Sequence, residues 1–416
     1  MTPEIEKRIK AVQAGRVPAG YKKSKIGIVP KEWDVFSLKN ISTELHETAG
    51  NGRYETLSIS AGVGFVNQTS KFGKDISGAQ YAKYTVLKKG DFSYNKGNSK
   101  KYPQGCVYQL KDRDEAVVPN VFESFRLTNG ENDFFEQLFI NGFLNDQLFS
   151  KINHGVRDDG LLNLRGDDFY SCQVPFPPIG EQKKIAEILA TQDRVIELKE
   201  KLIAEKQSQK KYLMSVLLGD DFKKPFKLNG VTIDKKKWEK STIGKISDIS
   251  TGNKDTQNKK DDGKYPFYVR SPNPERIDTY SYDGEAILTA GDGVGVGKVI
   301  HYVTGKFDFH QRVYKISDFD NHKAWGRFVY FYFLEHFYNR VKRMSAKNSV
   351  DSVRYSMISE MPLSLPSLPE QKAIADVLSA ADEEISLLQK GLEQEKLKKK
   401  SLMQLLLTGL VRVAKG

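Results

Sequence analysis

PPIGEQKKIAEILATQDRVIELKEKLIAEKQSQKKYLMSVLL, residues 177–218, occurs a second time as PSLPEQKAIADVLSAADEEISLLQKGLEQEKLKKKSLMQLLL, residues 366–407. The two copies align without a gap, so that Pro177 pairs with Pro366 and Leu218 pairs with Leu407. Each copy has a lead that contains proline, then Glu-Gln-Lys, and then a long helical pattern. Neither pattern contains a stop signal for about 39 residues, which predicts two helices, each about 58 Å long.

Apolar residues recur along both helices at alternating spacings of three and four, which is the pattern of a coiled-coil seam. A long helix with a one-sided apolar stripe is not stable alone in water, so its expected partner is its own copy. We expect an antiparallel pair, because a parallel pair would require the segment between the two copies to span the full helix length back to its start. The predicted seam residues are Ile185, Leu189, Ile196, Ile203, Leu213, Leu217, Ile374, Leu378, Ile385, Leu388, Leu392, Leu402 and Leu406. The polar residues that interrupt the seam are Gln192, Lys199, Lys206, Lys210, Glu395 and Lys399.

Composition limits the classes of protein to which the chain can belong. Its 416 residues allow two or three domains, and a formal net charge of +12 favours an anionic partner, most often nucleic acid. A basic protein without such a partner is the plain alternative. Cys106 and Cys172 have no metal or redox spacing and indicate a reducing compartment. No apolar run approaches the length of a membrane span, so we expect a cytoplasmic protein without a membrane partner.

The lead before the first insert is also repeated. YKKSKIGIVPKEWDVFSLKNIS, residues 21–42, has a counterpart in VTIDKKKWEKSTIGKIS, residues 231–247, which aligns Trp33 with Trp238. Each half therefore consists of a Trp lead, a variable insert, a Pro lead and a long helix. The repeated leads and long helices, which we call the frame, indicate one shared task. The two different inserts indicate two separate tasks. The expected segments are an N-terminal helix and lead at 1–20, a first domain at 21–175, a helix at 176–218, a linker at 219–240, a second domain at 241–364, a helix at 365–409 and a tail at 410–416.

Both inserts mix strands with one helix, which indicates two α+β domains of one fold. The helices are expected over 133–152 and 325–344. The Phe and Tyr residues of the second helix recur at helical spacing, so we expect them in the core and not stacked on bases. The expected strands are 54–60, 84–87, 107–110 and 121–127 in the first insert, and 267–270, 286–289, 299–303 and 307–316 in the second.

The loops of the inserts carry the candidate DNA contacts. GDGVGVGK, residues 291–298, fits neither the P-loop nor the dinucleotide fingerprint, which leaves a flexible loop that lets backbone approach a partner. YNKGNSKKYPQ, residues 94–104, concentrates Asn and Gln, which can read base edges, and Lys, which can hold phosphate. A solvated polar loop is the plain alternative. The predicted DNA-binding residues are Tyr94, Asn95, Lys96, Asn98, Lys100, Lys101, Tyr102, Gln104 and Arg157 in the first insert, and Lys264, Arg270, Lys298, His310, Gln311, Arg312, Lys347 and Asn348 in the second.

The sequence contains no catalytic signature. Its six histidines have no metal-ligand spacing, and we find neither a methyltransferase Asn-Pro-Pro-aromatic motif nor an acid-plus-Lys nuclease core. We therefore expect no catalytic residue, no metal and no cofactor in this chain.

Two motifs carry a resemblance to a known family. They are Pro-Pro-Ile-x-Glu-Gln-x-x-Ile-Ala-x-x-Leu at 177–189 and Pro-x-Leu-x-Glu-Gln-x-x-Ile-Ala-x-x-Leu at 366–378. Together with the duplicated layout, the lead GYKKSKIGIVPKEW at 20–33 and the ending LMQLLLTG at 402–409, they resemble the specificity (S) subunit of type I restriction-modification enzymes. The resemblance covers the whole chain, although the inserts match the family in layout only.

The resemblance implies an α+β fold class: two α/β target recognition domains separated by two long helices that form an antiparallel coiled coil, related by a pseudo-twofold internal repeat. Each domain would read one half of a bipartite, asymmetric site in double-stranded DNA, and the helices would set the spacer. The subunit would have no catalytic activity of its own. It would dock two adenine-N6 methyltransferase (M) subunits and, through them, restriction (R) subunits. S-adenosylmethionine, ATP and Mg²⁺ would be used by those partners.

Two alternatives stay open at this stage. One is a self-contained DNA methyltransferase or nuclease, which binding of S-adenosylmethionine by the isolated chain would reveal. The other is a basic coiled-coil scaffold for membranes or proteins, which a gel shift on random duplex DNA would separate from a DNA reader. The sequence does not identify the target bases.

Overall fold

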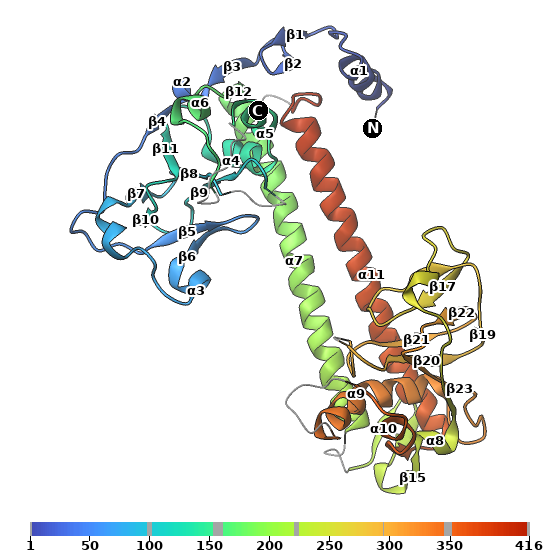
Figure 1. Ribbon diagram of the computed structural model, residues 1–416. Coiled ribbons are helices and arrows are strands. Elements are labelled where there is room, and N and C mark those ends of the chain that lie inside the picture. The colour runs from blue at the N-terminus through green and yellow to red at the C-terminus, as the bar shows by residue number, and fades with distance from the viewer. Residues whose placement is uncertain are drawn as a thin grey trace. The chain divides into compact units, whose positions relative to one another are not determined.

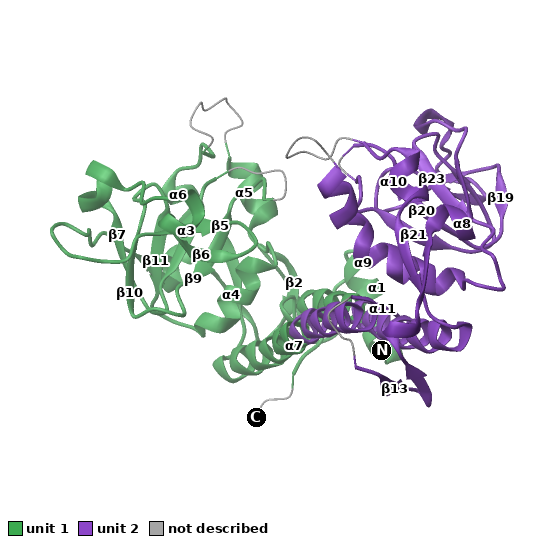
Figure 2. Ribbon diagram, turned by 90° about the horizontal axis from the view of Figure 1, so that it is seen from below, with its two compact units in different colours: residues 1–198, 392–416 green, residues 199–391 purple. Residues whose placement is uncertain are grey.

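The computed structural model describes residues 2–97, 102–152, 161–219, 224–293, 295–344 and 352–413 (Figure 1). Its longest elements are the helices α7 (Ile179–Leu218), of 40 residues, and α11 (Leu368–Leu406), of 39 residues. The chain divides into two compact units, residues 1–198 with 392–416 and residues 199–391, which we call unit 1 and unit 2 (Figure 2). Each unit therefore contains one insert domain and a part of both long helices.

The long helices run antiparallel within each unit. In unit 1, Ile185 and Leu189 near the start of α7 share a hydrophobic core with Met403 near the end of α11. In unit 2, Leu217 near the end of α7 shares a core with Ile374 near the start of α11. The start of one helix meets the end of the other in both units, so the predicted antiparallel pairing is confirmed.

The predicted seam residues are all buried or half-buried. The buried members are Ile185, Leu189, Ile203, Leu217, Ile374, Leu378, Ile385, Leu392 and Leu406. The half-buried members are Ile196, Leu213, Leu388 and Leu402. This burial is what the spacing of threes and fours predicts for the side chains that face a partner helix.

Polar residues that interrupt the seam are paired across it. In unit 1, Gln192 is 5% exposed and donates from Nε2 to the Glu395 carboxylate at 2.9 Å. In unit 2, Lys206 forms an ion pair with Glu384 at 2.7 Å, and Lys210 forms one with Asp382. A paired polar residue in a seam favours one register over its neighbours, because a shift would leave it without its partner.

Each long helix ends against a β-hairpin. In unit 1, after α1 (Pro3–Gln13), the hairpin of β1 (Tyr21–Ser24) and β2 (Gly27–Pro30) meets the end of α11, and the Tyr21 hydroxyl donates to the Gly409 carbonyl at 2.6 Å. In unit 2, the hairpin of β13 (Phe226–Leu228) and β14 (Val231–Ile233) precedes Lys235, whose ammonium donates to the Val216 carbonyl of α7 at 2.8 Å. The N-terminal lead and the central linker therefore occupy equivalent places in the two repeats.

A two-stranded ladder closes the base of each insert. β3 (Asp34–Ser37) pairs antiparallel with β12 (Gln173–Phe176), and β15 (Glu239–Thr242) pairs antiparallel with β24 (Pro362–Leu365). Short helices α2 (Leu38–Ile41) and α8 (Ile243–Ile246) follow β3 and β15. Each insert thus enters and leaves the frame through adjacent strands.

The central sheets of the two inserts have the same topology. In unit 1 the strand order is β4-β11-β8-β9, and in unit 2 it is β16-β23-β20-β21, with every neighbouring pair antiparallel. The equal order shows that the inserts share one fold, as predicted. The strands are β4 (Ser42–Glu44), β8 (Phe92–Asn95), β9 (Cys106–Gln109), β11 (Glu123–Leu127), β16 (Asp248–Thr251), β20 (Ala286–Ala290), β21 (Ile300–Val303) and β23 (Val313–Ser317).

The inserts differ in the strands added to this sheet. Unit 1 adds two antiparallel strand pairs, β5-β6 and β7-β10, and helix α3 (Gln68–Phe72), whereas unit 2 adds a second four-stranded sheet in the order β18-β17-β22-β19. The added strands are β5 (Leu57–Ser60), β6 (Gly64–Asn67), β7 (Thr85–Lys88), β10 (Glu115–Val118), β17 (Tyr265–Tyr268), β18 (Glu275–Ile277), β19 (Tyr282–Asp283) and β22 (Lys306–Phe309). The frame is therefore shared, and the surface built on it is not.

Two sequence-based elements are corrected by the structure. The single helix expected over 133–152 is two helices, α4 (Asn132–Ile140) and α5 (Asn145–Lys151), because Gly142 has a φ of +74° and reverses the chain between them. The single strand expected over 307–316 is split into β22 and β23 by a turn in which the Val313 N–H donates to the His310 carbonyl at 2.9 Å.

Aromatic residues fill the core of unit 2, as predicted. In α9 (Gly326–Met344), Phe328, Phe331, Phe333 and Phe337 are completely buried. Each buried aromatic side chain contributes about 1.5–3 kcal/mol relative to exposure. Short helices α6 (Gly166–Tyr170) in unit 1 and α10 (Tyr355–Ser359) in unit 2 complete the described helices.

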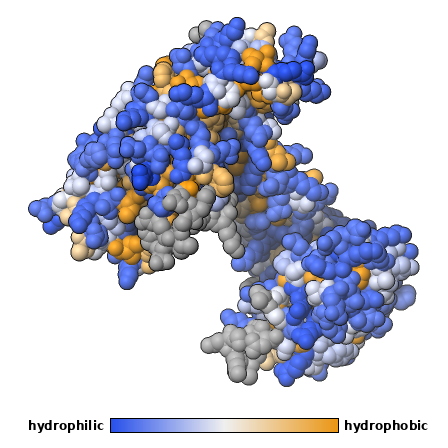
Figure 3. All heavy atoms as spheres, turned by 45° about the horizontal axis from the view of Figure 1, so that its top comes forward, coloured by the Kyte–Doolittle hydropathy of each residue, from blue (hydrophilic) through white to orange (hydrophobic). Residues whose placement is uncertain are grey.

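One face of the molecule is mainly polar. Figure 3 shows a predominantly hydrophilic face on which hydrophobic residues occur in small groups. In the described part of the chain, no helix combines the length and the apolar character that a membrane crossing requires.

Candidate nucleic-acid interface

A buried carboxylate at the start of each long helix holds the lead tryptophan. Glu181 is 1% exposed and accepts a hydrogen bond from Trp33 Nε1 at 2.9 Å, and Glu370 accepts one from Trp238 Nε1 at 3.3 Å. In unit 1, Arg412 also donates two bonds of 2.7 Å to Glu181, and these bonds raise the pKa of the Arg412 guanidinium. A carboxylate is buried at little cost only when it is paired in this way. The Glu of the motif is therefore a structural residue that joins lead and helix.

The neighbouring glutamine joins the helix to its insert domain through backbone atoms. Gln182 Nε2 donates to the Pro177 carbonyl at 2.7 Å, and its Oε1 accepts the N–H of Glu131, the residue before α4, at 2.8 Å. Gln371 Nε2 donates to the Pro366 carbonyl at 2.9 Å, and its Oε1 accepts the N–H of Trp325, the residue before α9, at 2.8 Å. Both inserts are thus fixed to the frame in the same way.

Two residues of the first insert that were predicted to contact DNA have side chains that are packed and paired inside the domain. Tyr94 is completely buried, its ring stacks on Phe169 with centroids 4.7 Å apart, and burial raises its pKa. Lys96 forms an ion pair with Glu123, and both side chains are mostly buried. Neither Tyr94 nor Lys96 is presented to a partner, because Tyr94 belongs to a stretch of β8 that is buried on both faces and Lys96 is paired with Glu123.

The other described candidates of the first insert have local roles in the loop. Asn95 Oδ1 accepts the N–H of Gly97 at 2.8 Å, which is a turn-forming bond. Gln104 accepts the Tyr94 hydroxyl at its carbonyl, and the Tyr102 side chain is half-buried. The remaining candidates lie outside the described residues: Asn98, Lys100, Lys101, Arg157, Lys347 and Asn348.

In unit 2, most of the predicted residues gather at one edge of the domain. Arg270 and Lys298 line one open pocket of about 770 Å³, together with Gly293 and Gly295. Lys264 lies at the opposite end of β17 from Arg270, with its ammonium 5.4 Å from the centre of the Tyr265 ring. Arg270 and Lys298 therefore lie together at the pocket, and Lys264 lies apart from them.

One carboxylate joins two of the predicted arginines. Arg270 Nη1 donates to Asp292 Oδ1 at 2.8 Å, and Arg312 Nη1 donates to Asp292 Oδ2 at 2.7 Å. Burial raises the pKa of Asp292, but the two guanidinium groups outweigh burial and hold it below its usual range. We call Arg270, Asp292 and Arg312 the arginine clamp. Asp292 is not among the residues predicted from the sequence, in which it is only an acidic residue of a glycine-rich loop.

His310 supports this edge from within. Its side chain is 2% exposed, its Nδ1 accepts the Arg312 N–H at 2.9 Å, and burial lowers its pKa. The neighbouring Gln311 is exposed and donates from Nε2 to Asp255 Oδ2 at 2.8 Å. His310 is therefore a structural support, while Gln311 and Arg312 face solvent.

The glycine-rich loop is needed for close packing. A Cβ at Gly295 would lie 2.5 Å from the Arg270 carbonyl, and Gly293 has a φ of +77°. Glycine is the residue that meets both requirements without strain. The loop thus brings its own backbone at Gly295 against the Arg270 carbonyl, which is the kind of close backbone approach expected from the sequence.

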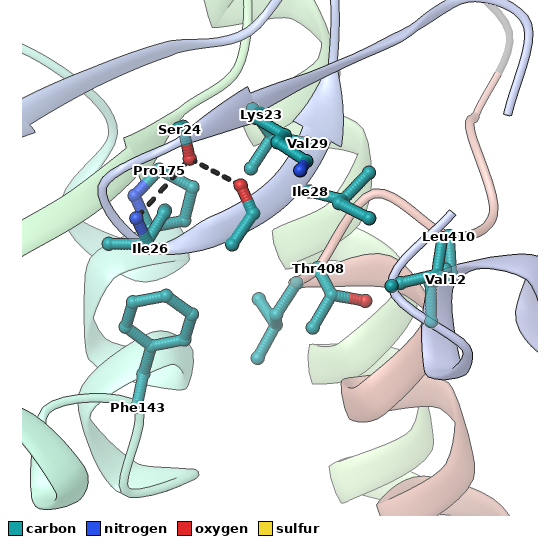
Figure 4. A pocket seen from close by; sticks show the side chains of 13 residues that line it. Val12, Lys23, Ser24, Ile26, Ile28, Val29, Phe143, Pro175, Thr408 and Leu410 are labelled. Carbon is teal, nitrogen blue, oxygen red and sulfur yellow. Dashed lines mark hydrogen bonds between the residues drawn. The ribbon is translucent and has the colours of Figure 1, made fainter. Parts of the chain in front are cut away.

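A second pocket, in unit 1, is apolar. It has a volume of about 550 Å³ and lies between α1, the β1-β2 hairpin and the end of α11 (Figure 4). Its lining includes Val12, Ile28, Phe143 and Leu410, and Lys23 is the one charged residue of that lining. Such a lining offers no acid–base chemistry. Within the described residues, no group of three or more His, Cys, Asp or Glu side chains is placed to hold a metal ion.

Comparison with known proteins gives a consistent family. A model of the type I restriction modification DNA specificity domain matches the chain twice, at residues 30–206 and 235–397. A relative described as the putative type I restriction enzyme MjaX specificity subunit of Methanocaldococcus jannaschii is 25% identical over 424 residues, which span 94% of this chain and 97% of the relative. The MjaVIII specificity subunit of the same organism is 28% identical over 283 residues, which span 62% of this chain and 66% of the relative.

Solved structures show the same fold. The S subunit of a type I restriction-modification system from M. genitalium superposes with a TM-score of 0.58 at 16% identity, covering 90% of this chain and 96% of that one. A chain from a study of complex assembly and conformational transition of the type I R-M system superposes with a TM-score of 0.56 at 16% identity, covering 92% and 99%.

Proposed function

This chain belongs to the type I restriction-modification DNA specificity family, and from that premise we propose that its two insert domains read the two halves of one bipartite, asymmetric DNA site. The observation that carries the proposal is the equal order of the two central sheets combined with their different added strands. Two domains with the same fold but different surfaces are what we expect if each domain binds a half-site of different sequence. We call the inserts the first and second recognition domains.

The charge of the chain supports a DNA partner. The formal net charge is +12, and Arg270, Lys298 and Arg312 are exposed at one edge of the second recognition domain. Basic side chains provide the sequence-independent attraction to phosphates, and fixed side chains in loops read the base edges. The chain itself would be non-catalytic, with S-adenosylmethionine, ATP and Mg²⁺ used by partner subunits. Binding of S-adenosylmethionine by the isolated chain would contradict that part of the proposal.

The paired helices would set the spacer between the half-sites. α7 and α11 are each continuous over 39 residues or more, so each is roughly 60 Å long. Duplex DNA advances about 3.4 Å per base pair. A change in helix length therefore converts directly into a change in spacer length.

Adding one heptad to both helices is expected to lengthen the spacer by about three base pairs. The additions belong beside Lys206 and beside Glu384, which face each other at 2.7 Å. Seven residues restore the seam phase and add about 10 Å. The experiment sequences the methylated sites in a host that carries this chain with its methyltransferase. The unmodified chain should give one bipartite motif, and the lengthened chain should give the same half-sites farther apart.

Two outcomes decide this experiment. A contiguous motif from the unmodified chain would contradict the proposed function. An active lengthened variant that keeps the original spacer would contradict the proposal that the helices set the spacer length. It would not contradict the proposal that each domain reads one half-site. An addition to α7 alone serves as the control, because it breaks the register of the seam and should lower the midpoint of thermal unfolding.

The helices would also dock two methyltransferase subunits. Leu198 of α7 and Leu387 of α11 occupy equivalent positions in the aligned repeats, and they are 48% and 60% exposed. A single exposed leucine is ordinary, but the same leucine left uncovered in both repeats suits two equal contacts with two copies of one partner. We therefore assign Leu198 and Leu387 to the two docking sites.

Replacing either leucine by glutamate is expected to reduce the complex from two methyltransferase subunits to one. The charge would be desolvated in an apolar contact, which disfavours docking at that site alone. Native mass spectrometry of the complex counts the bound subunits. Leu397→Glu is the matched control, since Leu397 is 66% exposed but its counterpart in the first repeat is Ser208. Two bound subunits in the Leu198→Glu, Leu387→Glu double variant would contradict the assignment.

A further inference from the structure

The arginine clamp of the second recognition domain is fixed from several sides. The Gly291 N–H donates to the Arg312 carbonyl at 2.8 Å, and the Val353 N–H donates to the Gly291 carbonyl at 2.7 Å. The buried His310 accepts the Arg312 N–H. The backbone of Gly291, which precedes Asp292, and the backbone of Arg312 are therefore held by hydrogen bonds, which favours a defined position for the carboxylate that binds Arg270.

The guanidinium of Arg270 keeps an unused donor edge. Its side chain is 41% exposed and uses Nη1 to bind Asp292. Within the described residues, its Nε and Nη2 groups donate to no other side chain. Arg270 also lines the open pocket of about 770 Å³ beside the glycine-rich loop. A side chain that lines open space thus retains two N–H donor groups that no described side chain accepts.

The clamp as a whole remains positively charged. Arg312 is 59% exposed and takes the second oxygen of Asp292, so two guanidinium groups share one carboxylate. Exposed ion pairs of this kind contribute little to stability, typically about 0–1 kcal/mol. The arrangement is therefore better suited to orienting a side chain than to holding the domain together.

Guanine is the base that matches such an edge. It presents two acceptors, O6 and N7, in the major groove, and an arginine can contact both at once. Adenine presents a donor and an acceptor there, which leaves one arginine N–H unpaired. A carboxylate that fixes the guanidinium lowers the entropy lost when this bidentate contact forms.

We propose that Arg270 reads a guanine in the half-site of the second recognition domain, with Asp292 as its positioning residue and Arg312 as the charge that keeps the clamp positive. The inference rests on the proposed function and extends it by naming the base and the residue that reads it. Phosphate binding by Arg270 is the competing role, and it would carry no base preference.

The test selects preferred sites from duplexes with a randomised half-site, using the complex of this chain with its methyltransferase. The unmodified complex should require a G·C pair at one position of the half-site read by the second recognition domain. That half-site is the one that changes when the second domain is exchanged for that of a relative. Arg270→Lys keeps the charge but loses the two-donor edge, and it should lower discrimination at that position about 5- to 150-fold. Asp292→Asn should lower discrimination at the same position by a smaller factor. Lys245→Ala, in the short helix α8 at the base of the insert, should leave every base preference unchanged.

The outcomes separate the inference from the proposed function. A half-site without a required G·C pair would overturn the inference, as would an Arg270→Lys variant that binds all sequences more weakly with unchanged preferences. Selection of no sequence by the unmodified complex would overturn the proposed function, and the inference with it. The other half-site is an internal check on folding, since all variants should still select it.

Discussion

Replacing Glu181 by alanine is expected to destabilise unit 1 by about 3–5 kcal/mol, because it leaves the buried Trp33 N–H without an acceptor and removes the buried carboxylate that pairs with Arg412. Trp33 Nε1 would lose its 2.9 Å bond, and Arg412 would lose two bonds of 2.7 Å to a carboxylate that is 1% exposed. Urea unfolding of the purified chain, followed by circular dichroism, measures the change. The unfolding transition of unit 1 should move to lower denaturant concentration, and that of unit 2 should stay in place.

Glu32 provides the matched control. It also bonds to Arg412, at 2.9 Å, but its side chain is 52% exposed. Glu32→Ala should change the free energy of unfolding by about 1 kcal/mol or less. Equal losses from Glu32→Ala and Glu181→Ala would show that burial of the Glu181 carboxylate is not what makes it important.

Exchange of residues 38–172 for the corresponding segment of a relative is expected to replace one half of the methylated motif and leave the other half intact. The segment lies between β3 and β12, which pair with each other and remain in the frame. The side chain of Gln182 holds the insert by accepting a backbone N–H at position 131, which any residue except proline supplies. The frame therefore makes few demands on the sequence of the insert.

Sequencing of the methylated sites measures the result of the exchange. The control is the equivalent exchange of residues 243–361, which lie between β15 and β24 and should alter the opposite half-site. Simultaneous change of both half-sites by either exchange would contradict the reading of each half by one domain. The two exchanges also identify which half-site belongs to which domain.

The frame could be predicted from sequence because it is repeated. Two copies of one pattern expose the seam, and a seam specifies both burial and a partner helix. The breaks inside the inserts were harder to predict. Gly142 lies within an apolar pattern that continues on both sides, and the turn at 310–312 lies within a β-rich run. The local periodicity of the sequence does not predict a break or turn that only the tertiary fold requires.

The candidate site shows the same limit. Residue type selects Arg270 and Arg312, which are exposed, but by the same criterion it selects Tyr94 and Lys96, whose side chains are buried or mostly buried. The role of Asp292 could not be predicted from the sequence, because it depends on two arginines that are distant in the chain and adjacent in space. Residue type suggests a contact, whereas the positions of neighbours decide whether the contact is available.

The contact between the N-terminal lead and the end of α11 has a consequence for synthesis. Arg8 donates to the Leu410 carbonyl at 2.9 Å, and the Tyr21 hydroxyl donates to Gly409, so unit 1 draws on both ends of the described chain. Unit 2 is a continuous segment, residues 199–391. On the ribosome, domains generally fold as units in the order in which they emerge. The second recognition domain has all of the contacts of unit 2 available once residue 391 has been synthesised, whereas unit 1 is complete only when residues 392–413 follow, so we expect unit 2 to complete its folding first.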